Sequence, residues 1–259
     1  MCMPYLLPCN VTRIRVTRDT PRLCRTFDKM AAMTEAAPSK TLLLGDIFPN
    51  FQAETTNGPM DLHEYLGTSW GLLCSHPADY TPVCTTELGT CAKLEETGEF
   101  AKRDVKVMCI SVDPLESHVG WKADIKAASG YEVNFPMICD PDGSLSAKLG
   151  MLHGDKHHAT GLPLTVRSVY VIGPDKKLKL SLTYPATTGR NFNEILRAID
   201  SMQTTSSKSL ATPADWKQGE KCMVLPMVTN DQAKERFPEY NQIEVPSGRN
   251  YLRMTPVPK

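Results

Sequence analysis

The chain has 259 residues, and its 29 Lys plus Arg are balanced by 29 Asp plus Glu, with 41% hydrophobic residues. Zero net charge excludes a whole-protein attraction to nucleic acid, and no apolar run reaches the roughly 20 residues that span a bilayer. Nine scattered cysteines do not have the dense pairing of a secreted disulfide scaffold. We therefore expect a protein with reduced thiols, in the cytosol or an organelle matrix, and no nucleic-acid partner.

Residues 1–33 are rich in arginine and poor in acidic side chains. This composition is typical of a mitochondrial transit peptide. An unstructured tail, or an extension ahead of a start at Met30 or Met33, explains it equally well. We treat residues 1–40 as a basic N-terminal extension, so mitochondrial import stays open beside the cytoplasmic location.

From residue 42 onward, apolar runs alternate with helical patterns. Residues 70–74 and 105–113 predict buried strands, and residues 163–185 predict a hairpin that turns at 173–175. Helices are predicted from Pro82 onward, over 114–129 and over 191–205. This order indicates an α/β fold with a central mixed sheet flanked by helices. We assign it to residues 41–205, and the Pro-rich, polar residues 206–259 to a small C-terminal domain with short strands.

The segment HGDKHH, residues 153–158, places His153 and His157 four residues apart. That spacing can hold a metal ion, but no carboxylate or thiol follows at a ligand-like distance. We expect a solvated loop here, no metal site, and no cofactor anywhere in the chain.

The cysteine at position 84 lies in the stretch SHPADYTPVCTTELG, residues 75–89. With Thr81 as N-cap, Cys84 falls in the first helical turn, where unpaired N–H groups and the helix dipole favour an anion. Such surroundings can lower a cysteine pKa from ~8.5 to between ~3.5 and 7.5, which makes the thiolate a nucleophile toward peroxides. A buried structural cysteine is the alternative.

The pattern Pro-x-x-x-Thr-x-x-Cys, from Pro77 to Cys84, resembles the active-site signature of the peroxiredoxins, more narrowly the one-cysteine, peroxiredoxin-6 type. The resemblance extends over nearly all of residues 42–259, through segments such as LLLGDIFPNF, GPDKKLKLS, YPATTGRNF and YLRMTP. It implies a thioredoxin-like fold, with the C-terminal domain contributing dimer contacts in a homodimer. The implied activity is thiol-dependent reduction of hydrogen peroxide and of organic or phospholipid hydroperoxides.

The resemblance also assigns catalytic roles. Cys84 is the nucleophile that becomes a sulfenic acid, and Thr81 offers its hydroxyl to the peroxide. Pro77 shields the thiolate from water, and Arg167 stabilises both the thiolate and the developing negative charge.

Three further side chains are implied as supports that orient Arg167 and the loop: His76, Glu87 and Arg190. For Arg190 a surface salt bridge is the alternative interpretation.

A cysteine that would resolve the sulfenic acid is missing from its usual place. Thr212 stands where two-cysteine peroxiredoxins carry it, and Cys222 is out of register. Cys91 is seven residues from Cys84, about 10.5 Å along a helix, beyond the ~7 Å limit of an unstrained disulfide. An external thiol must therefore reduce Cys84. The resemblance implies glutathione, delivered with a glutathione transferase, while thioredoxin stays open.

The segment GTSWG, residues 67–71, matches the Gly-x-Ser-x-Gly pattern of serine hydrolases. The resemblance implies a calcium-independent phospholipase A2 activity with peripheral phospholipid contact, through Ser69, His63 and Asp175. Thr68 replaces the aspartate that this family carries in the motif, which weakens the lipid interpretation. A thioredoxin-fold binding or chaperone protein is the alternative from another class.

Overall fold

The computed structural model describes residues 42–157, 161, 163–206 and 208–258. The basic N-terminal extension, and with it the transit-peptide hypothesis, lies outside these residues. Among the helices of the described ranges, none combines the length and the apolar character that a membrane span requires.

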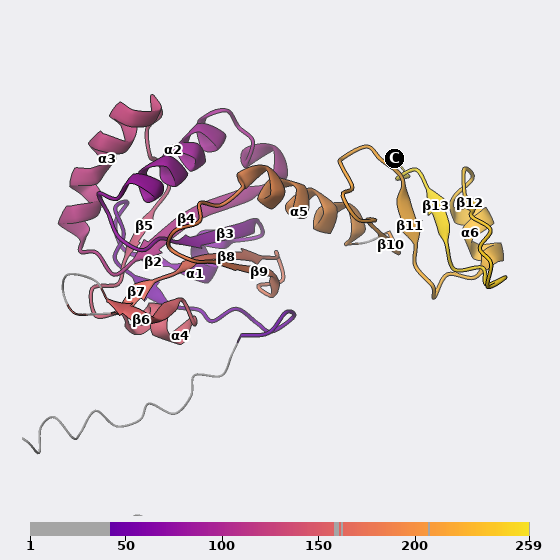
Figure 1. Ribbon diagram of the computed structural model, residues 1–259, viewed down its shortest axis with the longest axis horizontal. Helices are drawn as coiled ribbons and strands as arrows, with labels where there is room; N and C mark the ends of the chain where they lie inside the picture. Colours follow the sequence, from indigo (N-terminus) through magenta and orange to yellow (C-terminus); the bar gives the residue numbers. More distant parts are fainter. Residues whose placement is uncertain (1–41, 158–160, 162, 207, 259) are drawn as a thin grey trace, which may run out of the picture. The chain divides into compact units, whose positions relative to one another are not determined.

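A five-stranded mixed sheet forms the centre of the fold (Figure 1). Its strand order is β5-β4-β3-β8-β9, with β3, β4 and β5 parallel to one another and β8 antiparallel to both β3 and β9. The strands are β3 (Trp70–Ser75), β4 (Val105–Ser111), β5 (Met137–Cys139), β8 (Arg167–Ile172) and β9 (Leu178–Tyr184). The predicted central mixed sheet is thus confirmed.

Helices cover both faces of this sheet, and neighbouring residues of one strand enter different cores. Leu72 packs in a core with residues of α2 (Pro82–Glu96), α3 (Leu115–Ser129) and α5 (Phe192–Thr205). Leu73 packs in the opposite core with residues of α1 (Leu62–Leu66) and α4 (Ser144–Lys148). Burial on both faces explains why these strands appear in the sequence as continuous apolar runs.

The predicted strands, helices and hairpin are present. Several further elements escaped prediction, most of them because they are too brief for a periodic signal, and the six-residue strand Leu152–His157 because its sequence is polar. These are β1 (Gln52–Ala53), β2 (Met60–Asp61), α1, the 3₁₀ turn Ala101–Arg103, β5, α4, β6 (Leu152–His157) and β7 (Pro163–Thr165). The expectation of a solvated loop at residues 153–158 was wrong for 153–157. These residues belong to β6, which pairs antiparallel with β7 and leaves Gly154–His157 exposed.

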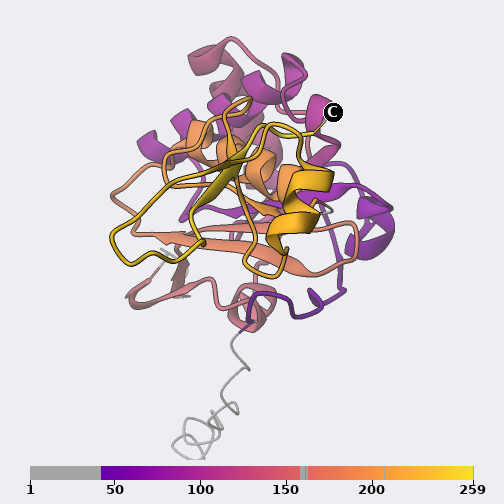
Figure 2. The ribbon, with the colours of Figure 1, turned by 90° about the vertical axis from the view of Figure 1, so that its right-hand side faces the viewer.

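The C-terminal residues form a separate four-stranded antiparallel sheet of order β10-β11-β13-β12. Its elements are β10 (Leu210–Ala211), β11 (Cys222–Val224), α6 (Asn230–Arg236), β12 (Asn241–Gln242) and β13 (Arg253–Thr255). Figure 2 shows α6 beside these strands, where Ala233 and Phe237 pack with Trp216 and Val224. The predicted short strands are present, whereas α6, held by a capping box at Thr229, was not foreseen.

The pairing of β3 with β8 brings the sequence-predicted site together. Cys74 lies opposite Val169, so Arg167, two residues earlier on the antiparallel strand, lies level with the loop that follows β3. That loop leads directly into α2, whose first turn carries Cys84.

Candidate active site

Cys84 lies in the first turn of α2, behind a tightly turned loop. Thr81 is the N-cap residue and Pro82 opens the helix, as predicted. The Thr81 hydroxyl does not cap the helix, because it donates instead to the Ala78 carbonyl oxygen at 2.9 Å. Tyr80 holds a left-handed backbone with φ of 52°, which is costly for a non-glycine residue and is found at functional sites. The loop thus closes over Cys84, which is fully buried.

The guanidinium of Arg167 is directed at the Cys84 thiol. Its Nη1 lies 3.3 Å from Cys84 Sγ and also donates to Glu87 Oε2 at 2.7 Å. Its Nε and Nη2 donate to the Ala186 carbonyl oxygen at 3.0 and 2.7 Å. Four hydrogen bonds therefore fix the orientation of the group, and a preorganised cation of this kind stabilises negative charge without rearranging.

Glu87 joins the two arginines that the sequence analysis named. Arg190 donates to it from the backbone nitrogen at 2.7 Å, from Nε at 3.0 Å and from Nη2 at 2.7 Å. Arg190 Nη1 also donates to the carbonyl oxygens of Ser75 and Ser168, at 2.8 and 3.0 Å. The surface salt bridge considered for Arg190 is wrong, because the residue is only 7% exposed.

The cluster of Glu87, Arg167 and Arg190 is buried and carries one net positive charge. An isolated buried charge is unfavourable unless a counter-charge lies beside it. Cys84 is the group at hydrogen-bond distance from Arg167 that can supply it as a thiolate. The Arg167 guanidinium is therefore in position to stabilise negative charge on this sulfur.

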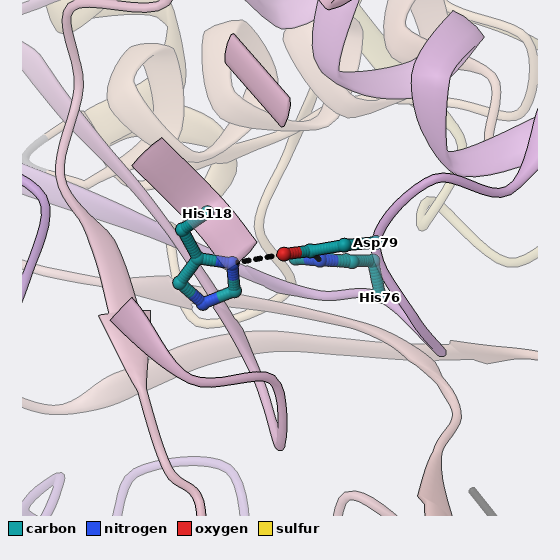
Figure 3. Close-up of side chains that lie close together, drawn as sticks. All are labelled: His76, Asp79 and His118. Atoms are coloured by element: carbon teal, nitrogen blue, oxygen red, sulfur yellow. Dashed lines mark hydrogen bonds and ion pairs between the residues drawn. The ribbon is translucent and has the colours of Figure 1, made fainter. Parts of the chain in front are cut away.

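The loop before Cys84 is anchored by a buried His–Asp–His group (Figure 3). The Asp79 carboxylate lies 2.9 Å from His76 Nε2 through Oδ1, and 2.7 Å from His118 Nδ1 through Oδ2. Ser117 also donates to Oδ2 at 2.7 Å, and the Asp79 backbone nitrogen donates to Asp113 at 3.0 Å. These bonds attach the loop to the start of α3, so His76 supports the loop through Asp79.

No role was predicted for Asp79 or His118 from the sequence. Asp79 lies within the Pro77–Cys84 signature, and this position is the sequence feature that could have marked it as part of the site. His118 is 39 residues further along the chain, and its contact with the loop depends on how α3 packs.

The charges within this group are strongly asymmetric. Burial disfavours the charged form of His118, but its hydrogen bonds to Asp79 and Cys139 outweigh that effect and raise its pKa to about 10. Burial lowers the pKa of His76, which keeps this ring neutral. The pKa of Asp79 is lowered because the hydrogen bonds from both histidines outweigh its burial. An imidazolium at His118 therefore faces a carboxylate at Asp79.

We predict an alkaline loss of stability that depends on His118. Because its folded pKa of about 10 exceeds the usual 6.5, its contribution is complete below about pH 6.5 and is lost as the pH rises through about 10. The free energy of unfolding, measured by urea titration, should fall across this range and fall less steeply in His118→Gln. Equal slopes in the two proteins would contradict the assigned imidazolium.

His76, Asp79 and His118 also have the composition of a metal site, the single such group of three or more ligand-type side chains within the described ranges. His76 Nε2, His118 Nδ1 and both Asp79 carboxylate oxygens are engaged with one another or with Ser117, while the buried His76 Nδ1 has no hydrogen-bond partner. His118 also places Nε2 3.2 Å from the Ile138 carbonyl oxygen. We interpret the group as a hydrogen-bonded network.

The three residues of the hydrolase hypothesis make hydrogen bonds in other directions. Ser69 donates to Asp104 at 2.7 Å, His63 Nε2 lies 2.8 Å from the Phe48 carbonyl oxygen, and Asp175 accepts from Lys179 at 2.7 Å. The serine also precedes β3 and does not stand on a strand-to-helix turn. The phospholipase triad stays a prediction that these hydrogen bonds do not support.

The chain matches two family models and several known proteins. The model of the AhpC/TSA family matches residues 44–181, and that of the C-terminal domain of 1-Cys peroxiredoxin matches residues 201–239. Peroxiredoxin-6 of Gallus gallus is 52% identical over 84% of this chain and 99% of its own length. Peroxiredoxin-6 of Homo sapiens is 53% identical, over 84% and 98%.

Two solved structures resemble the fold. A cysteine-to-serine mutant of the peroxiredoxin 6 of Arenicola marina is 53% identical with a TM-score of 0.81, covering 84% of this chain and 99% of that one. A yeast mitochondrial 1-Cys peroxiredoxin is 43% identical with a TM-score of 0.76, covering 83% and 100%.

Fold, site and comparisons together define a thiol peroxidase built on a thioredoxin-like fold. The chain belongs to the AhpC/TSA family, and within it to the one-cysteine peroxiredoxins of the peroxiredoxin-6 type.

Proposed function

We propose that the protein reduces hydrogen peroxide and organic or phospholipid hydroperoxides through Cys84, and that glutathione then reduces the enzyme. The observation that carries this proposal is the Arg167 guanidinium, fixed 3.3 Å from Cys84 Sγ. A cation in this position favours the thiolate before the reaction and the developing oxyanion during it.

The reaction consists of a nucleophilic displacement on oxygen. The Cys84 thiolate attacks the distal peroxide oxygen, an S–O bond forms, and the O–O bond breaks. The leaving alkoxide or hydroxide takes up a proton, and Cys84 becomes a sulfenic acid. We assign to the Thr81 hydroxyl, now donating to Ala78, a hydrogen bond to the bound peroxide. Pro77, which is buried in the same loop, excludes water from the thiol.

Reduction of the sulfenic acid requires a thiol from outside the chain. Cys222 is buried in the C-terminal sheet, and the Thr212 hydroxyl is hydrogen-bonded to Ser201 at 2.6 Å. A thiol that attacks the sulfenic sulfur forms a mixed disulfide and releases water, and a second thiol restores Cys84. The related yeast enzyme is described as resolved via glutathione/thioredoxin systems, which supports a small thiol or a redoxin for this chain.

The reductant is tested by steady-state peroxide consumption with glutathione alone, with glutathione plus a glutathione transferase, or with thioredoxin and its reductase. We expect turnover with glutathione and acceleration by the transferase. If peroxide were consumed with thioredoxin and its reductase but not with glutathione, glutathione would be rejected as the reductant. The proposed peroxidase reaction at Cys84 would still stand.

We predict that excess peroxide without a reductant inactivates the enzyme. With no partner thiol available, the sulfenic acid reacts again and Cys84 becomes sulfinic or sulfonic acid. Peptide mass spectrometry should locate two or three added oxygen atoms on Cys84. A stoichiometric Cys84–Cys222 disulfide would instead contradict the one-cysteine mechanism.

We further propose a homodimer, with the C-terminal domain of residues 206–259 in the contact, and a cytoplasmic location. The Arg-rich composition of residues 1–33 supports mitochondrial import as the alternative location. Fusing residues 1–41 to a fluorescent protein decides between the two locations: cytosolic fluorescence supports the proposal, and mitochondrial fluorescence overturns it.

Sedimentation of the full chain at micromolar concentration tests the proposed homodimer.

A further inference from the structure

The loop that precedes Cys84, residues 76–81, closes over the thiol. Cys84 is fully buried, although its reaction requires a peroxide and then a thiol to reach the sulfur. The two residues assigned to peroxide binding and water exclusion, Thr81 and Pro77, belong to this loop. Thr81 Oγ1 donates to the Ala78 carbonyl oxygen at 2.9 Å, so the place of its hydroxyl depends on how the loop itself is folded. The contacts that hold the loop are therefore expected to affect the reaction.

Asp79 attaches the middle of the loop to two other elements. Its Oδ1 lies 2.9 Å from His76 Nε2, within the loop. Its Oδ2 accepts from Ser117 Oγ at 2.7 Å and lies 2.7 Å from His118 Nδ1, both at the start of α3. Its backbone nitrogen donates at 3.0 Å to Asp113, which lies beyond the end of β4. One residue thus connects the loop to α3 and to the segment that follows β4.

The geometry around His118 gives its ring a positive charge. Nδ1 faces the Asp79 carboxylate at 2.7 Å, and Nε2 faces the Ile138 carbonyl oxygen at 3.2 Å. A carboxylate and a carbonyl oxygen can only accept, so both ring nitrogens must donate, as they do in an imidazolium. The side chains of His118 and Asp79 are 0% and 1% exposed. Because separating a buried ion pair leaves an uncompensated charge on each side, this pair holds the loop firmly against α3.

Tyr80 makes a second contact between the loop and α3. Its ring centroid lies 6.2 Å from that of Trp121. Its hydroxyl lies over Gly120, where an added Cβ would come within 2.6 Å of the Tyr80 oxygen. The left-handed backbone of Tyr80, with φ of 52°, is unfavourable and persists only where the surroundings maintain it. The hydrogen bonds of the adjacent Asp79 supply that constraint.

We propose that Asp79 is a positioning residue of the peroxidase reaction. Its carboxylate, paired with His118, keeps the loop closed so that Thr81 and Pro77 are in place when a peroxide arrives. Asp79 acts on Cys84 through the loop, and the inference rests on the proposed reaction at that thiol. Loss of the carboxylate would let the loop open, which exposes the sulfur and at the same time misplaces the groups that bind the peroxide.

Two reactions of Cys84 should therefore change in opposite directions in Asp79→Asn. The reaction with stoichiometric hydrogen peroxide, followed by stopped flow, requires the closed loop. It should be at least about tenfold slower, because misplaced groups are costly to a reaction that depends on their orientation. Alkylation of Cys84 by iodoacetamide, located by peptide mass spectrometry, requires only access to the sulfur. It should be at least about threefold faster, because the loop opens more often.

Asp155→Asn is the matched control, because it makes the same chemical change at an exposed Asp–His pair. Asp155 Oδ1 lies 2.6 Å from His153 Nδ1, and its side chain is 81% exposed. Both rates should equal those of the native protein. If the native protein reacts with peroxide, unchanged rates in Asp79→Asn would overturn the positioning role alone. A change of both rates in the same direction would also overturn it, because destabilisation or altered thiol ionisation affects the two reactions alike.

Ser117→Ala provides a milder test of the same contact. It removes one hydrogen bond to Asp79 Oδ2 and keeps the ion pair with His118. We expect changes of about threefold in the same two directions, as the loss of one hydrogen bond implies. Urea unfolding monitors the folding of each variant. If Asp79→Asn does not fold, Ser117→Ala decides, and unchanged rates in that variant overturn the proposal.

Discussion

Replacing Cys84 with serine is expected to abolish peroxide consumption. A serine hydroxyl is a much weaker nucleophile toward a peroxide than the thiol it replaces, even with the Arg167 guanidinium, which lies 3.3 Å from Cys84 Sγ, beside it. Removing a catalytic nucleophile costs orders of magnitude in rate, and we expect a loss of at least about 10³-fold. The measurement is stopped-flow loss of hydrogen peroxide with stoichiometric reduced protein, which requires no external reductant.

Cys222→Ser is the matched control for this experiment. Cys222 is also buried, but it lies in the core of the C-terminal sheet and its pKa is raised by burial. The control should consume peroxide at the rate of the native protein. Equal, slow consumption by native protein and Cys84→Ser would show that the site is present without being reactive.

The second large effect is expected at Glu87, which lies between the two buried arginines. In Glu87→Gln the amide keeps one acceptor oxygen, but its NH₂ group faces guanidinium donors and the negative charge is lost. Breaking a buried ion pair by removing one partner costs about 3–5 kcal/mol. We therefore expect a loss of about 3 kcal/mol or more in the free energy of unfolding, measured by urea titration.

Glu194→Gln makes the same chemical change at a solvent-exposed pair. Arg197 Nε donates to Glu194 Oε2 at 2.6 Å, and the side chains of Glu194 and Arg197 are 44% and 31% exposed, respectively. Exposed ion pairs of this kind contribute little to stability, and we expect Glu194→Gln to lower the free energy of unfolding by less than about 1 kcal/mol. If the two variants were destabilised equally, the buried cluster would not hold the charges assigned to it. Peroxide consumption should fall in Glu87→Gln as well, because Arg167 loses one of its anchors.

The surroundings of Cys84 differ from those of the other buried cysteines. The Arg167 guanidinium, which Glu87 holds in place, lies beside the Cys84 sulfur. The cysteines whose pKa is raised by burial show the contrary case, in which the apolar core opposes ionisation. The Asp79 carboxylate contacts both His76, in the loop before Cys84, and His118, in α3.

Local features of the sequence determined much of this protein. The apolar runs at 70–74 and 105–113 indicated buried strands, and Thr81-Pro82 located the start of α2 and the place of Cys84 within it. These signals depend on residues within one helical turn or one strand, so the elements can be predicted from short segments of the sequence. The signature around Cys84 identified the family for the same reason.

Only the tertiary structure decided which distant side chains meet. Arg167 reaches Cys84 from 83 residues away because β8 pairs antiparallel with β3, and Glu87 bonds Arg190 across 103 residues. The contacts of His118 with Asp79 and with the Ile138 carbonyl oxygen follow from the packing of α3 against the loop before α2 and against β5. Strand register and helix packing are set by the whole core, which no short segment specifies, and burial then sets the charge of each group.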